Sequence, residues 1–366
     1  MSIVYRVSCP QPGLKGNIIL EPSKSISNRA LIIRSLCKEV FTIHLLSKSD
    51  DTVILEKMLS SEDEKLYAGH AGTSCRFMVA KAALGNREVI IDASEHLKRR
   101  PIGTLVKALQ TLGADITYLN KEGFPPLKIK PSEKLGMDVH EVTLQAGISS
   151  QYISALLMIA PCLPLGLTIH MADDPVSVPY IRMTLAMMEW FGVNHEWNGN
   201  TIAIKHADYV AKDFTVEGDW SAASYFYSAA ALAEKAEIQI EGVVEKSLQG
   251  DSVTKDIYHQ FGVETNFNEN GITIRKISNH EKIKEFSYDF SSCPDLAQTV
   301  MVTMAGLGIK GKLSGLRTLR IKETDRISAM QTELAKVKTT LEVSEEGADI
   351  SCKLFGKARW KDKAKF

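Results

Sequence analysis

The order of apolar and polar residues repeats along the chain, and each repeat predicts the same elements. It has an amphipathic helix, a short break usually marked by glycine, and two alternating strands around a turn. Four stretches follow this order, at residues 101–130, 180–205, 253–276 and 326–353. Residues 51–60 predict another such helix, with its hairpin cut short. An order of elements that recurs along a chain indicates repeated supersecondary units.

Between these stretches lies a second recurring element, a short strand followed by a mostly apolar helix. Small polar residues open each of these helices, which are predicted at 23–36, 70–84, 147–161, 218–233 and 291–307. Helices that are apolar around most of their circumference should be buried. The alternation of strands and helices therefore predicts an α/β fold.

The repeat predicts a sixth apolar helix after the hairpin that ends near residue 353. Only 13 residues follow that position, and they contain no apolar helix. We therefore expect the last repeat to be incomplete, either because the chain is truncated or because its lineage has lost that unit. The length of 366 residues favours two domains over a single core.

Charge and hydropathy narrow the class of protein. The 44 basic and 44 acidic residues balance, so the chain lacks the basic excess of most nucleic-acid and membrane-surface proteins. No apolar run reaches membrane-spanning length, and the N-terminus has no secretory h-region. We expect a cytoplasmic protein without a nucleic-acid or membrane partner.

The cysteines and histidines do not follow the spacing of a metal site. The six cysteines are far apart without a CxxC pair, and the nine histidines show no HExxH arrangement. We therefore expect no structural metal, no disulfide framework and reduced thiols.

The stretch EPSKSISNRAL (21–31) raises the first functional question. In a helix, Lys24, Ser25, Asn28 and Arg29 form one strip over the first turn and a half. One interpretation is a serine N-cap followed by cations whose stems lie along apolar surface. The other is an anion site, because cations oppose the dipole at a helix N-terminus and a bound phosphate would stabilise both. The spacing is not that of a P-loop.

Two further polar clusters open predicted helices. In LRIKETDRISAM (319–330), the polar run includes Lys322, Glu323, Asp325 and Arg326. Such a run is either a surface salt-bridge cluster or part of a site. In SSCPDLAQTV, Pro294 suits the first helical position and places Asp295 in the first turn. That carboxylate is either a partner of the helix dipole or a general base.

Eight motifs, in this order, make the chain resemble the 5-enolpyruvylshikimate-3-phosphate synthase (3-phosphoshikimate 1-carboxyvinyltransferase) family. They are SKSISNRAL, HAGTSCRF, KRRPIGTLVKAL, ISSQYISALLM, VEGDWSAASYF, LQGDS, PDLAQT and IKETDRISAM. The resemblance covers residues 15–340. The sister family, the UDP-N-acetylglucosamine enolpyruvyl transferases, shares the fold but has an asparagine where this chain has Ser25.

The resemblance implies a two-domain enolpyruvyl transferase fold of repeated βαβαββ units, an inside-out α/β barrel. One domain is expected over residues 19–213. The other combines residues 1–18 with 214–366, and its last repeat is expected to be incomplete.

The resemblance also implies an activity, the transfer of the enolpyruvyl group of phosphoenolpyruvate to the 5-hydroxyl of shikimate 3-phosphate. This is a step of the shikimate pathway to chorismate and the aromatic amino acids, and it needs no metal or organic cofactor. We expect a monomer with these two small-molecule substrates. The alternatives are a truncated relative that binds shikimate 3-phosphate without turnover, another enolpyruvyl transferase, or a non-catalytic scaffold. Retention of Lys24, Asp295, Glu323 and Arg326 argues against a scaffold.

Matching positions imply the roles of individual residues. The shikimate 3-phosphate contacts are Lys24, Ser25, Arg29, Ser149, Ser150, Gln151, Ser177, Tyr180, Asp295 and Lys322. The phosphoenolpyruvate contacts are Lys24, Gly72, Arg100, Gln151 and Arg326. Asp295 is expected to accept the proton of the 5-hydroxyl, and Glu323 to move the proton at the methylene carbon. Lys24 is the third residue with an expected catalytic role.

Overall fold

The chain forms two compact units in the computed structural model, which describes residues 13–144, 149–172, 177–322, 324–346 and 349–356. Unit 1 comprises Met1–Glu21 and Gly218–Phe366, and unit 2 comprises Pro22–Glu217. These divisions lie a few residues from the boundaries expected at 19 and 214.

Unit 2 contains the described elements from α1 to β11. Its helices are α1 (Lys24–Leu36), α2 (Asp50–Ser60), α3 (Gly72–Ala83), α4 (Gly103–Thr111), α5 (Ser150–Ile159) and α6 (Val178–Trp190), with 3-10 turns at η1 (Leu97–Arg99) and η2 (Ala160–Cys162). Its strands are β2 (Ile43–His44), β3 (Lys65–Tyr67), β4 (Val89–Asp92), β5 (Asp115–Tyr118), β6 (Leu127–Lys130), β7 (Glu141–Leu144), β8 (Leu167–Met171), β9 (His195–Asn198), β10 (Thr201–Ile204) and β11 (Phe214–Thr215).

Unit 1 takes its first strand, β1 (Gly13–Ile19), from the N-terminal part of the chain. Its helices are α7 (Trp220–Leu232), α8 (Thr254–His259), α9 (Ala297–Leu307) and α10 (Arg326–Lys336), with 3-10 turns at η3 (Gly250–Val253), η4 (Pro294–Leu296) and η5 (Arg317–Ile321). Its other strands are β12 (Lys235–Glu241), β13 (Val263–Asn268), β14 (Gly271–Lys276), β15 (Tyr288–Asp289), β16 (Gly311–Ser314), β17 (Thr340–Glu346) and β18 (Asp349–Phe355).

Four sheets of the described residues share one strand order, which confirms the predicted repeat. They are β3-β4-β6-β5, β7-β8-β10-β9, β1-β12-β14-β13 and β15-β16-β18-β17. In each, the first two strands are parallel and the last two form the antiparallel hairpin. The helix predicted at 51–60 is also confirmed as α2. The chain continues from α2 to β3, which pairs in parallel with β4, so α2 has no hairpin of its own.

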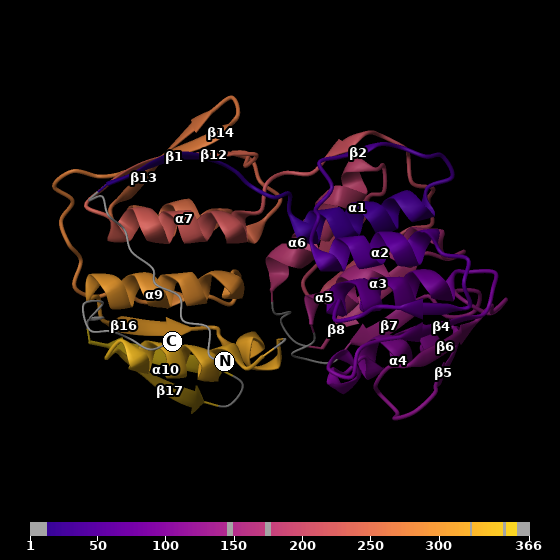
Figure 1. Ribbon diagram of the computed structural model, residues 1–366. Helices are drawn as coiled ribbons and strands as arrows, with labels where there is room; N and C mark the ends of the chain where they lie inside the picture. Colours follow the sequence, from indigo (N-terminus) through magenta and orange to yellow (C-terminus); the bar gives the residue numbers. More distant parts are fainter. Residues whose placement is uncertain (1–12, 145–148, 173–176, 323, 347–348, 357–366) are drawn as a thin grey trace, which may run out of the picture. The chain divides into compact units, whose positions relative to one another are not determined.

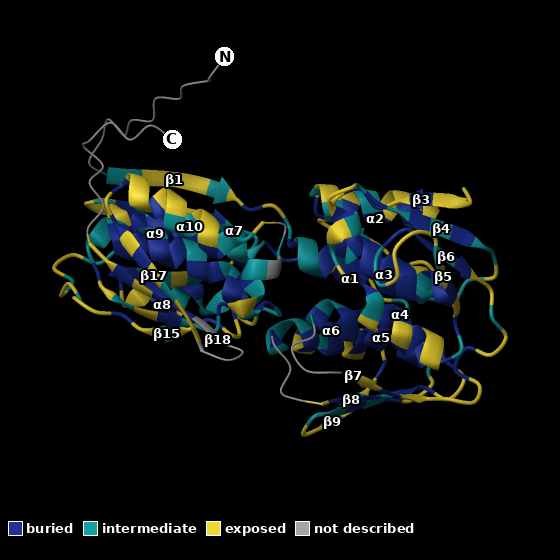
Figure 2. Cartoon of the chain, turned by 90° about the horizontal axis from the view of Figure 1, so that it is seen from below, coloured by how far each residue is buried: buried dark blue, intermediate teal, exposed yellow. Residues whose placement is uncertain are grey.

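The five predicted apolar helices are confirmed as α1, α3, α5, α7 and α9, and Figure 2 shows how much of them is buried. Every residue of α3 is buried except Thr73 and Lys81, and every residue of α5 except Gln151. In unit 1, α7 and α9 pack together (Figure 1), and the Ser228 and Thr303 hydroxyls hydrogen-bond between them at 2.7 Å. Among the described residues, no helix is both long and apolar enough to cross a membrane.

Candidate functional site

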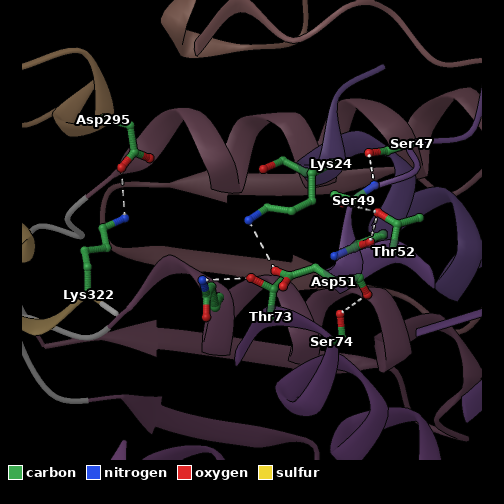
Figure 3. Close-up of polar contacts among 12 residues, drawn as sticks. Lys24, Ser47, Ser49, Asp51, Thr52, Thr73, Ser74, Asp295 and Lys322 are labelled. Carbon is green, nitrogen blue, oxygen red and sulfur yellow. Dashed lines mark hydrogen bonds and ion pairs between the residues drawn. The ribbon is translucent and has the colours of Figure 1, made fainter. Parts of the chain in front are cut away.

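In unit 2, the polar residues that open several helices are linked to one another. Lys24 Nζ of α1 lies 3.2 Å from Asp51 Oδ1 of α2, and Ser74 Oγ of α3 donates to the Asp51 carbonyl oxygen at 2.6 Å (Figure 3). Gln151 Nε2 of α5 donates to Thr73 Oγ1 of α3 at 3.0 Å. The N-terminal ends of α1, α2, α3 and α5 therefore lie close together.

Asp51 supplies an anion that the sequence interpretation of α1 did not foresee. The Lys24 side chain is 44% exposed and that of Asp51 is 22% exposed. The cations of α1 were expected to need a bound anion, but Asp51 already balances the charge of Lys24. Lys24 has three N–H donors, so the ion pair leaves it able to bind a substrate as well.

The interpretation of a serine N-cap on α1 is confirmed in position but not in its side-chain hydrogen bond. Ser23 occupies the N-cap position, but its hydroxyl makes no cap hydrogen bond and is buried without a hydrogen-bond partner in the described part of the chain. Its N–H donates to the Glu217 carbonyl oxygen at 2.8 Å. Ser149 does cap α5, since its Oγ accepts from the Gln151 N–H at 3.4 Å. The first turn of α1 therefore keeps N–H groups that no side-chain cap satisfies.

Arg29 is 2% exposed and binds other parts of unit 2. Its Nε donates to Thr184 Oγ1 at 2.7 Å, and its NH1 to the Ser25 carbonyl at 2.9 Å. Its NH2 donates to Ser154 Oγ at 3.0 Å and the Tyr180 carbonyl at 3.3 Å. Burial lowers the pKa of Arg29 to about 10, which keeps it charged at neutral pH. Arg29 thus joins α1 to α5 and α6. Its NH1 group has a second N–H, which can still donate to a substrate, so the expected substrate contact remains a prediction.

The predicted polar strip on α1 is only partly exposed. Lys24 and Ser25 are partly accessible, whereas Asn28 is buried and its Oδ1 accepts from Thr52 Oγ1 of α2 at 2.8 Å. Because α1 packs against α2, α3, α5 and α6, little of its circumference reaches solvent. Within the predicted strip, the first turn is therefore the part that can meet a ligand.

Two guanidinium groups approach Gly72 at the start of α3. A Cβ atom added to Gly72 would lie 2.6 Å from Arg100 NH1 and 3.2 Å from Arg76 NH1. The glycine therefore leaves room for both guanidinium groups, and a larger residue here would displace the end of the Arg100 side chain. Two cations beside the unpaired N–H groups of a helix N-terminus favour an anion at this point.

The remaining predicted residues of unit 2 lie at the starts of α5 and α6. Ser150 is the first residue of α5 and is buried, while Gln151 is half-buried. Ser177 is buried at the N-cap of α6, with a left-handed backbone at φ 57°, and Tyr180 lies in the first turn of that helix. Four helix starts of unit 2 thus carry predicted substrate-binding residues, at α1, α3, α5 and α6.

In unit 1, the structure brings three predicted residues together around Asp295. Pro294 lies at the start of η4 as expected, and Asp295 follows it directly before α9. Arg326 NH1 donates to Asp295 Oδ1 at 2.8 Å. Lys322 Nζ lies 3.4 Å from the same atom, and Figure 3 shows this ion pair. The Asp295 side chain is 20% exposed, so this carboxylate is held by two cations but still reaches solvent.

The polar run that includes Lys322 and Arg326 serves two purposes. Asp325 is the N-cap of α10, accepts from the Ser328 N–H at 3.1 Å, and pairs with Arg320 at 2.7 Å. Burial would raise the pKa of Asp325, but these hydrogen bonds outweigh it and lower the pKa to about 2. Asp325 therefore has a structural role, while Lys322 and Arg326 bind Asp295. The fourth charged residue of the run, Glu323, lies outside the described residues.

A second carboxyl group in unit 1, Asp251 of η3, was missed as a candidate. It is buried, and Ser221 Oγ at the start of α7 donates to its Oδ2. Burial and then the charge of Asp295 raise its pKa to about 7, although Ser221 and Lys322 act in the opposite direction. The sequence signal for Asp251 is the LQGDS motif, to which it belongs. The resemblance to the family assigned no role to this residue.

The raised pKa of Asp251 predicts a pH dependence of stability. The folded chain binds a proton at Asp251 that the unfolded chain has lost above about pH 4, so this stabilisation is complete below pH 4 and disappears as the pH rises through 7. Asp251→Asn should therefore reduce the loss of unfolding free energy between pH 4 and pH 7 by roughly 3 kcal/mol. Urea denaturation at each pH measures this. A pH dependence identical to that of the parent chain would contradict the assignment.

The sequence matches one family of enzymes over most of its length. Residues 53–361 match the family described as EPSP synthase (3-phosphoshikimate 1-carboxyvinyltransferase). The 3-phosphoshikimate 1-carboxyvinyltransferase of Bacteroides fragilis (strain YCH46) is 43% identical over 334 residues, which cover 91% of this chain and 80% of that protein. The enzyme of the same name from Vibrio campbellii is 34% identical over 362 residues, covering 91% of this chain and 83% of that protein.

Solved structures show the same fold. The EPSP synthase of Acinetobacter baumannii, solved at 2.37 Å, superimposes with a TM-score of 0.72 at 20% sequence identity. The match covers 94% of this chain and 82% of that chain. The predicted two-domain fold of repeated βαβαββ units is thereby confirmed.

Proposed function

The chain belongs to the EPSP synthase family, and on that premise we propose that it transfers the enolpyruvyl group of phosphoenolpyruvate to the 5-hydroxyl of shikimate 3-phosphate. The products are 5-enolpyruvylshikimate 3-phosphate and phosphate. The observation that carries the proposal is the Asp295 carboxylate, held by Arg326 at 2.8 Å and by Lys322 at 3.4 Å. This arrangement provides a fixed base beside groups that bind anions.

The charges of the two substrates explain the cations. Each substrate carries a phosphate and a carboxylate, so several negative charges must be bound at once. Unit 2 provides Lys24, the Gly72 end of α3 and Arg100, and unit 1 provides Lys322 and Arg326. Charge-assisted hydrogen bonds from such groups are stronger than neutral ones, and preorganised donors stabilise charge that develops during reaction.

The reaction itself needs proton transfer at oxygen and at carbon. Asp295 takes the proton of the 5-hydroxyl as that oxygen bonds to C2 of phosphoenolpyruvate, while C3 gains a proton and becomes a methyl group. The C2–O bond to phosphate then breaks, and C3 returns a proton to restore the double bond. We assign the proton at carbon to Glu323 on the basis of the resemblance. These steps use acid–base groups and cations of the chain, so the proposal includes no cofactor.

Most of the proposed substrate contacts lie at the starts of helices. On the basis of the resemblance, the proposed shikimate 3-phosphate contacts are Lys24, Ser25, Arg29, Ser149, Ser150, Gln151, Ser177 and Tyr180 of unit 2, and Asp295 and Lys322 of unit 1. Lys24, Gly72, Arg100, Gln151 and Arg326 bind phosphoenolpyruvate. The support is that hydroxyl and amide groups occupy the starts of α5 and α6, where a phosphate also meets backbone N–H groups.

The proposal is tested by measuring phosphate release with different acceptors. The chain is incubated with phosphoenolpyruvate and either shikimate 3-phosphate or UDP-N-acetylglucosamine, and the mass of the organic product is determined by mass spectrometry. We expect phosphate and the enolpyruvyl product only with shikimate 3-phosphate. Release with the nucleotide sugar would identify another enolpyruvyl transferase, and tight shikimate 3-phosphate binding without release would identify a binding protein.

Gly72→Ala should weaken phosphoenolpyruvate binding selectively. The new methyl group would lie 2.6 Å from Arg100 NH1, so the guanidinium must move, which a long side chain can do without unfolding the domain. A displacement of this size in a binding group costs up to about 100-fold. We expect KM for phosphoenolpyruvate to rise by about 10- to 100-fold and KM for shikimate 3-phosphate to change much less.

Gly16→Ala is the matched control, because nothing lies within 4 Å of the added atom. It should leave both KM values unchanged. Equal increases in both KM values for Gly72→Ala would contradict the selective displacement of Arg100.

A further inference from the structure

We infer that Arg76 is a positioning residue, which orients the Gln151 amide so that it presents N–H donors to the bound anion. The inference rests on the proposed function, in which Gln151 contacts both substrates. Neither the position matching nor the acid–base chemistry gave Arg76 a role, although it lies in the HAGTSCRF motif.

The contacts of Arg76 and Gln151 fix the amide from both sides. Arg76 NH1 donates to Gln151 Oε1, and Gln151 Nε2 donates to Thr73 Oγ1 at 3.0 Å. Arg76 NH2 points to the Pro101 carbonyl at 3.4 Å, and its guanidinium lies over the Tyr152 ring at 5.2 Å. Arg76 is 6% exposed, so these contacts leave its side chain little freedom.

The chemistry of the guanidinium determines which end of the amide faces the ligand. An amide has a donor end and an acceptor end of nearly the same shape, so a glutamine can adopt either orientation. Arginine has donors only, and therefore Arg76 can pair only with the oxygen of Gln151. The NH2 group is then directed toward Thr73 at the start of α3, with a second hydrogen left for a ligand. In the opposite orientation the amide oxygen would face, and repel, an anion.

The charge of Arg76 is itself unusual for a buried group. Its hydrogen bonds among the described residues go to an amide oxygen and a carbonyl oxygen rather than to a carboxylate, and a buried cation without a counter-ion is costly. A Cβ atom added to Gly72 would lie 3.2 Å from Arg76 NH1 and 2.6 Å from Arg100 NH1, so the two guanidinium groups approach the same place. The charge strengthens the hydrogen bond from the guanidinium to Gln151 Oε1, and so holds the amide in this orientation.

The test is a double-mutant cycle read in phosphoenolpyruvate binding, measured by titration calorimetry with shikimate 3-phosphate present. Arg76→Met and Gln151→Ala should each weaken binding by about 10- to 30-fold. The double variant should bind no more than about 2-fold worse than Gln151→Ala, since Arg76 acts through that amide. Arg76→Lys, which keeps a donor for Oε1, should restore most of the affinity.

Arg87→Met is the control for a purely structural arginine. Arg87 donates to the carbonyl oxygens of Ser61, Glu62 and Asp63, so its loss should lower Tm without changing binding. The inference is overturned if the losses from Arg76→Met and Gln151→Ala multiply, if Arg76→Met binds normally, or if the parent chain does not bind phosphoenolpyruvate. A chain that shows the coupling in binding but no turnover would instead contradict the proposed function alone.

Discussion

Asp295→Asn should lower kcat by about 100- to 10,000-fold while shikimate 3-phosphate still binds within a few-fold of the parent affinity. The amide has the shape of the carboxylate but cannot accept the hydroxyl proton, and general-base catalysis contributes a factor of this size. Binding should persist, because Lys322 and Arg326 remain in place and lose the carboxylate that competes for their charge. Steady-state kinetics and calorimetric titration of shikimate 3-phosphate measure the two effects.

Glu269→Gln makes the same charge change at an exposed residue between β13 and β14, and it should be fully active. The thermal unfolding of Asp295→Asn should be compared with that of the parent chain, so that misfolding is recognised. A kcat within 3-fold of the parent value in a folded variant would show that Asp295 is not the base.

Lys24→Met should lower kcat/KM for phosphoenolpyruvate by about 100- to 1,000-fold. Removing one preorganised donor from a site of developing charge costs this much in other enzymes. The variant also leaves Asp51 without its partner at 3.2 Å, which adds a negative charge where the substrates bring theirs. Kinetics with each substrate varied in turn should show a loss for both, since Lys24 is proposed to contact both.

Lys38→Met is the matched control for Lys24→Met. Lys38 follows the end of α1 and pairs with Asp208, and both side chains of that pair are well exposed. Exposed pairs contribute about 1 kcal/mol or less to stability, so activity should not change. If Lys24→Met were as active as Lys38→Met, the first turn of α1 would not be part of the site.

The repeated architecture could be predicted from the sequence because its signals are local. The periodicity of 180–205 and 253–276 fixes a helix and a hairpin in each, and the structure has α6 with β9 and β10, and α8 with β13 and β14. The pairing of β1 with β12 could not be predicted locally, because Gly13 and Lys235 meet across more than half of the chain.

The candidate site was predicted less completely, for reasons that the contacts make clear. Lys24 and Asp295 were identified because each opens an apolar helix. Asp51, which pairs with Lys24, and Arg76, which donates to Gln151, were not predicted. Each comes from a different helix than its partner, so the contact depends on packing. Ser23 occupies the N-cap but makes no capping hydrogen bond, because the propensity of serine for this position does not fix the orientation of its hydroxyl.

Phosphorus NMR of the chain mixed with shikimate 3-phosphate and phosphoenolpyruvate tests the central claim most directly, because it distinguishes the two phosphates. We predict that the phosphoenolpyruvate signal is lost while inorganic phosphate appears in equal amount, and that the phosphate of shikimate 3-phosphate stays attached to the product. The reaction should require both substrates. Loss of the shikimate phosphate, release from phosphoenolpyruvate alone, or binding shifts without any release would contradict the account.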